Sequence, residues 1–137
     1  MKEGRRNVVS EPLRKMPTNK VVEWLDNQSA ETLYITAVTR AELRFGVLRL
    51  PNGKRKNALA AKIERVPDLF KDRTLDFDSL AADKLAQIAA ECEKKGKRAV
   101  APDAYIAACG AARGYAVATR NGSHFEHLGV RVIDPWL

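Results

Sequence analysis

Hydrophobic positions along the chain follow two patterns that alternate with each other. Short runs rich in β-branched and aromatic residues are typical of buried strands, whereas apolar residues that repeat every three to four positions indicate helices. An apolar piece at 7–12 ends in turn signals, and strands are expected at 32–38, 74–77, 115–119 and 130–133. Helices are expected at 19–27, directly after 32–38, and at 57–70, 78–95 and 100–113, with a loop or short helix at 120–127. This alternation predicts an α/β fold with a parallel sheet.

The helix expected at 100–113 is unusually apolar, because nearly every position after Asp103 is apolar or small. A helix that is apolar on nearly every side is a buried helix. Pro102 suits the first helical position, which places Asp103 in the first turn, where the helix dipole favours a carboxylate. Asp103 therefore has two interpretations. It is either a helix-start charge that adds about 0.3–1 kcal/mol of stability, or a ligand for a metal or a substrate.

Two more polar side chains follow the expected ends of strands, where parallel sheets bind ligands. Glu42 completes the pattern Thr39-Arg40-Ala41-Glu42. This is a capping box, so Glu42 taken alone is interpreted as a helix cap. Asn121 precedes a glycine in a typical turn pair, although its carbonyl oxygen also suits a metal or a bound water.

The sequence gives little support for other common catalytic or metal-binding motifs. His124 and His127 are spaced as a metal pair, but zinc needs three or four ligands, and the better interpretation is surface histidines. Cys92 and Cys109 are neither a C-x-x-C pair nor a disulfide framework, and we expect small buried thiols in a reducing cytoplasm. The chain has no Ser/His/Asp arrangement, phosphate-cradling glycine loop or Walker pattern.

The composition, 45% hydrophobic and 30% charged over 137 residues, predicts one globular domain covering 1–137. No apolar run approaches a membrane span and the first residues lack the core of a secretory signal, so we expect a cytoplasmic protein. The net charge of +7 favours a polyanion such as nucleic acid, or an acidic protein, against the alternative of a solvated basic surface. Two carboxylates near strand ends suit Mg²⁺, and with a basic chain they suggest metal-assisted phosphodiester hydrolysis.

Several segments, taken together, carry a resemblance to a known family. They are NVVSEPLR (7–14), YITAVTRAELRFGVLRLPNGKRKNAL (34–59), LDFD (75–78), APDAYIAA (101–108), AVATRN (116–121) and VIDPW (132–136). In this order and spacing the chain resembles the PIN-domain proteins of the VapC/FitB toxin type. The resemblance implies a three-layer α/β/α domain with a parallel sheet of four to five strands. It also implies a homodimeric, Mg²⁺-dependent ribonuclease, with Mn²⁺ as the alternative ion, that a cognate antitoxin neutralises by docking on the early helices, roughly 13–70.

The family gathers four acidic positions over one edge of its sheet. The resemblance assigns the second to Glu42 and the third to Asp103, both as metal ligands, and the fourth to Asn121, which keeps an oxygen that orients water or metal. The first position falls on Arg5, and residues 1–6 lack the apolar start of the family's first strand, so this end is expected to fray. A guanidinium has no lone pair for a metal. The chain is therefore either an active toxin ribonuclease or a catalytically impaired PIN domain that still binds antitoxin or RNA.

Overall fold

The computed structural model describes residues 7–9, 33–64, 70, 72–99, 101–119 and 122–133. Its centre is a five-stranded sheet in the order β3-β2-β1-β4-β5. Every neighbouring pair in this sheet is parallel, which confirms the predicted α/β fold and the expected sheet of four to five strands. The strands are β1 (Asn7–Val9), β2 (Leu33–Thr36), β3 (Thr74–Leu75), β4 (Ala116–Ala118) and β5 (Val132–Ile133).

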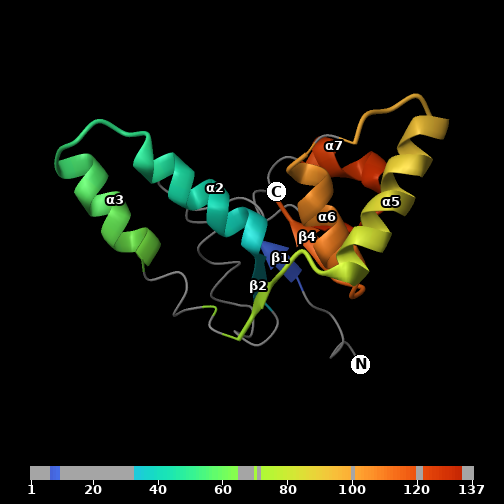
Figure 1. Cartoon of the computed structure of the whole chain (residues 1–137), viewed down its shortest axis with the longest axis horizontal. Helices are drawn as coiled ribbons and strands as arrows, with labels where there is room; N and C mark the ends of the chain where they lie inside the picture. Colours follow the sequence, from blue (N-terminus) through green and yellow to red (C-terminus); the bar gives the residue numbers. More distant parts are fainter. Residues whose placement is uncertain are drawn as a thin grey trace.

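Helices lie on both sides of these strands. Figure 1 shows α5, α6 and α7 gathered on one side, while α2 and α3 extend away on the other. The helices are α2 (Ala37–Leu48), α3 (Lys54–Glu64), α5 (Ser79–Lys94), α6 (Asp103–Ala111) and α7 (Gly122–Phe125), followed by the 3₁₀ helix η2 (Glu126–Leu128). The helix expected at 19–27 and the end of the one expected at 57–70 lie outside the described residues. In the part of the chain that is described, no helix combines the length and apolar character needed to cross a bilayer.

The main core forms where α6 packs on the middle of the sheet. Six of the nine residues of α6 are buried, which confirms the expectation of a buried helix. Gly110 allows this close approach, because a Cβ added there would lie 3.3 Å from Cγ2 of Val8 in the central strand. Val8 and Val117 are completely buried beneath the helix. The position of α6, and hence of Asp103 at its start, is therefore fixed by tight packing against β1 and β4.

A second, smaller core holds the two helices of the extended arm together. It consists of Leu43 and Val47 from α2 and Ile63 from α3, with Leu59 and Ala60 packed against them. Leu43 and Val47 are one helical turn apart, so they form a single stripe on α2. The arm thus has apolar support of its own, separate from the main core.

Candidate functional site

The carboxyl edge of the sheet is marked by buried hydroxyl groups. Thr36 at the end of β2, Thr39 in α2 and Thr119 just after β4 are each no more than 1% exposed. The Oγ1 atoms of Thr36 and Thr39 are 3.0 Å apart and share a hydrogen bond. Sequence reasoning missed these threonines as supports of the edge, although their position at the end of apolar strands was the available signal. The hydrogen bonds between Thr36 and Thr39 fix the chain where β2 passes into α2.

The capping box predicted for Glu42 is wrong. The N-cap of α2 is Thr36, whose Oγ1 accepts a hydrogen bond from the backbone N–H of Thr39 at 2.9 Å. The helix thus begins at Ala37, and Thr39 already lies inside it. The β-branched and aromatic run predicted a strand that continues to residue 38. The Thr36 hydroxyl instead accepts a hydrogen bond from a free N–H of the first helical turn, so the N-cap lies one turn before Thr39.

Glu42 therefore lies in the body of α2 rather than in its cap. It is half-buried and lies directly before the buried Leu43. Helix α2 contacts α6, the helix that begins with Asp103. Both helices have an end at the carboxyl edge, because α2 leaves β2 there and α6 runs back toward the start of β4. The helices that carry the two carboxylates are thus neighbours, as the resemblance requires.

Asp103 is the first residue of α6, which confirms its predicted place in the first turn. Its side chain is 26% exposed, and its Oδ2 lies 3.5 Å from Nδ1 of His124. Burial raises the pKa of the Asp103 carboxyl, and the electrostatic influence of His124 and His127 only partly opposes this shift. The ionised carboxylate thus loses more hydration than its neighbours replace. Such a group gains from a bound cation.

The two histidines do different things. His124 is exposed, as expected of a surface histidine, but it faces Asp103, a contact that sequence reasoning did not predict. His127 is half-buried, and its Nε2 lies 2.8 Å from the backbone oxygen of Arg98. Within the described ranges, no three His, Cys, Asp or Glu side chains gather closely enough to hold a metal.

Arg5 and Asn121 lie outside the described residues, so the described site consists of Glu42 and Asp103. Its donors are oxygen atoms alone, which suit Mg²⁺ better than zinc. Mg²⁺ usually keeps several waters and takes only one or two protein carboxylates, so the absence of a larger group among these residues is compatible with it. The partly buried, incompletely compensated carboxylate of Asp103 fits such an ion.

The two cysteines are structural. Both are buried, as expected, and they are not joined by a disulfide. Burial raises the pKa of the Cys109 thiol to about 11, with the nearby Asp78 carboxylate adding to the shift. A thiol with this pKa is protonated at neutral pH and is neither a nucleophile nor a good metal ligand.

Comparison with known proteins gives one consistent result. The PIN domain family matches residues 6–130. The chain is 44% identical to the toxin FitB of Neisseria gonorrhoeae over 95% of this chain and 94% of that protein. It is 41% identical, with the same coverage, to the VapC ribonuclease Y4jK of Sinorhizobium fredii. Among solved structures, FitAB bound to an IR36 DNA fragment superposes with a TM-score of 0.87 at 40% identity, covering 96% of both chains.

Proposed function

Because this chain belongs to the PIN-domain family, we propose that it is the toxin of a toxin–antitoxin pair and a metal-dependent endoribonuclease. The observation that carries this proposal is the partly buried Asp103 carboxylate at the start of α6, beside the helix that bears Glu42. The similarity to a toxin and to a ribonuclease along nearly the whole chain supports the same assignment. The reaction is hydrolysis of an RNA phosphodiester bond.

In this proposal Asp103 and Glu42 hold the ion, and Asn121 orients water through its amide oxygen. Bound Mg²⁺, or Mn²⁺ in its place, supplies positive charge beside the scissile phosphate. The packing of α6 on the sheet positions the start of the helix that carries Asp103, and His124 lies 3.5 Å from the carboxylate. The net charge of +7 raises the local concentration of the polyanionic substrate.

The partners follow from the same family membership. We infer a cognate antitoxin, because the solved relatives include the FitAB assembly and a DNA-bound VapBC assembly from Salmonella typhimurium, the latter at 26% identity and a TM-score of 0.80. We also infer that the toxin is a homodimer and acts in the cytoplasm. Loss of toxicity on co-expression with the neighbouring reading frame, and a dimer mass in solution, would test these inferences.

A second candidate function rests on Arg5, to which the resemblance assigns the family's first acidic position. Two unit charges 4 Å apart interact by about 4 kcal/mol at an effective dielectric constant of 20, so a guanidinium in the site would strongly repel Mg²⁺. It would pair instead with Glu42 or Asp103. The chain would then bind antitoxin or RNA but cleave poorly. Restoring Arg5→Asp should raise metal-dependent cleavage under this alternative, and an unchanged rate would count against it.

The deciding experiment incubates the purified protein with RNA and Mg²⁺ or Mn²⁺, with EDTA as the metal-free control. Asp103→Ala should abolish cleavage. The matched control is Asp83→Ala, which removes an exposed carboxylate from α5 and should leave the rate unchanged. Cleavage that survives Asp103→Ala would overturn the metal-ribonuclease assignment, because a contaminating nuclease or another site would then be responsible.

A further inference from the structure

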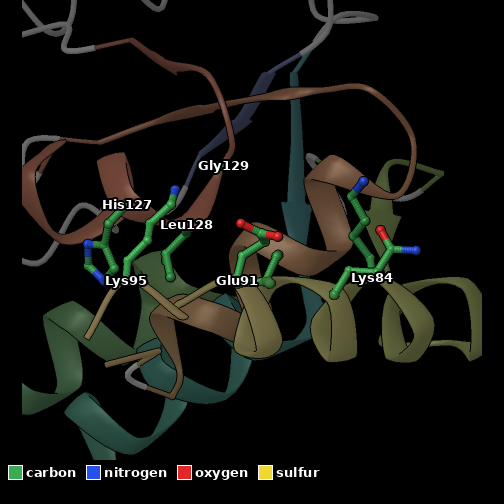
Figure 2. Close-up of a pocket in the computed structure, with 8 residues that line it drawn as sticks. Lys84, Glu91, Lys95, His127, Leu128 and Gly129 are labelled. Atoms are coloured by element: carbon green, nitrogen blue, oxygen red, sulfur yellow. The ribbon is translucent and has the colours of Figure 1, made fainter. Parts of the chain in front are cut away.

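A groove of about 190 Å³ runs between α5 and the turn formed by η2 and Gly129. Figure 2 shows the labelled side chains along its two walls. Helix α5 contributes one wall and η2 with the following glycine contributes the other. The lining residues are Lys84, Gln87, Ile88, Glu91 and Lys95 on α5, and His127, Leu128 and Gly129 opposite.

The groove combines an apolar floor with cationic ends. Ile88 and Leu128 are 6% and 2% exposed, so they form a closed base beneath it. Lys84 and Lys95 lie toward opposite ends, with Glu91 between them (Figure 2). At 1.5 Å per residue, the backbone positions of the two lysines are about 16 Å apart along the helix. This spacing suits an extended, repeatedly charged ligand better than a single small anion.

The segment that ends α5 and follows it is strongly basic. It holds five cationic residues and two acidic ones between positions 84 and 98. The cations are Lys84, Lys94, Lys95, Lys97 and Arg98, and the acids are Glu91 and Glu93. Glu91 is partly neutralised by Lys94, whose Nζ lies 3.8 Å from its Oε2. The local charge is therefore complementary to a polyanion.

The groove and the candidate site share one short segment of the chain. His124 faces Asp103, and three residues later His127 lines the groove. The hydrogen bond between the His127 ring and the backbone oxygen of Arg98 ties this wall to the loop that carries the other cations. The segment formed by α7 and η2 thus contributes one residue beside Asp103 and another to the groove, and His127 is near enough to act electrostatically on the Asp103 carboxyl.

We propose that this groove binds the backbone of single-stranded RNA beyond the scissile bond, with Lys84 and Lys95 each contacting a phosphate. The identity of the ligand rests on the proposed ribonuclease function. Glu91 limits the affinity, because its carboxylate repels the phosphates between the two lysines. The groove is thus an extended substrate site that lengthens the RNA footprint without taking part in the chemistry.

The test measures binding of a fluorescent single-stranded RNA in EDTA, where cleavage is off, at several salt concentrations. The double variant Lys84→Ala/Lys95→Ala should bind roughly tenfold more weakly, and the slope of log K against log salt should fall in magnitude by about 1.4, since each phosphate contact on a single strand contributes about 0.7. The matched control Lys97→Ala/Arg98→Ala also removes two positive charges but leaves the groove intact. It should lose less affinity and keep most of the slope.

A variant that should bind RNA more tightly controls for loss of binding through misfolding. Glu91→Gln should tighten RNA binding several-fold, which a damaged fold would not do. Equal losses in the two double variants, or an effect on antitoxin affinity in place of RNA affinity, would overturn the proposal. If wild-type protein cleaves RNA while Lys84→Ala/Lys95→Ala binds it normally, only the groove proposal falls. If RNA binds through the lysines without metal-dependent cleavage, only the ribonuclease proposal falls.

Discussion

Replacing glycine with alanine should change the stability of the protein in opposite directions at two positions inside helices. Gly110 in α6 faces the central strand, where an added Cβ would lie 3.3 Å from Val8 Cγ2 and 3.6 Å from the carbonyl oxygen of Tyr115. Gly46 in α2 has nothing within 4 Å of the same atom. Val8 is completely buried in the middle of the sheet, so the added methyl group would push a core side chain by a few tenths of an ångström. Replacing each glycine with alanine thus separates helix propensity from packing.

The expected magnitudes follow directly from these surroundings. Alanine is favoured over glycine in a helix by about 0.5–1 kcal/mol, and both variants receive this gain. Gly46→Ala receives nothing else and should be more stable than the wild type by about that amount. Gly110→Ala also overpacks a closed core, which typically costs about 1–3 kcal/mol, so it should be less stable by about 1 kcal/mol. The free energies of unfolding of the two variants should differ by about 1–3 kcal/mol.

Urea unfolding followed by circular dichroism measures both free energies, and a melting curve should show the variants separated by several degrees. A third variant, Gly110→Val, should be less stable than Gly110→Ala because it adds bulk at the same contact. If Gly110→Ala were as stable as Gly46→Ala, the tight approach of α6 to β1 would be wrong. The position of Asp103 at the start of that helix would then need another explanation.

Three further predictions concern titrating groups. Burial raises the pKa of Asp103 in the folded protein, so this carboxylate costs stability near neutral pH and that cost disappears as the pH falls below the unfolded pKa. Asp103→Asn should therefore unfold at higher urea than the wild type near pH 7 while losing cleavage, with the gain shrinking in acid. For Asp78, the hydrogen bond from Arg113 at 2.6 Å, followed by the one from the Ala81 N–H, lowers the pKa of the carboxyl. The ionised Asp78 therefore stabilises the fold above the ordinary aspartate pKa range, and this stabilisation is lost as the pH falls through the pKa of the folded protein. Asp78→Asn should consequently be less stable near pH 7 and equal to the wild type in acid; a loss that persists in acid would contradict this. Both thiols are buried, and burial raises the pKa of Cys109 to about 11, so neither should react with Ellman's reagent at pH 8 until the protein unfolds; rapid labelling of the native protein would refute the burial of at least one of them.

The sequence predicted the elements whose local signals agree with their packing. The helices expected at 78–95 and 100–113 are each followed by a glycine, and these residues, Gly96 and Gly114, adopt positive φ of 70° and 77°, where glycine is favoured. The apolar run from Ala104 to Ala112 predicted a buried helix because a helix with no polar face has no stable exposed orientation. These features depend on neighbours in sequence, so the chain alone carries the information.

The start of α2 could not be predicted from the same kind of signal. Two hydroxyl residues, Thr36 and Thr39, compete for the N-cap, and the capping-box pattern favoured the second. The first prevails because β2 ends there, at the edge of a sheet whose register is set by β1 and β3. The contact between Asp103 and His124 was equally invisible, since it joins α6 to a helix that lies beyond β4. Both features depend on tertiary packing, which no local pattern encodes.

The opposite shifts in the pKa values of Asp103 and Asp78 show why one is a candidate site and the other is structural. Asp78 caps α5 and binds Arg113, so every interaction that it makes favours its charged form and stabilises the fold. Asp103 lies in the first turn of α6, where the helix dipole also favours a carboxylate, yet burial dominates and raises its pKa against the opposing influence of His124 and His127. A carboxylate that costs stability when the protein is alone and gains from a cation fits a site selected for what it binds.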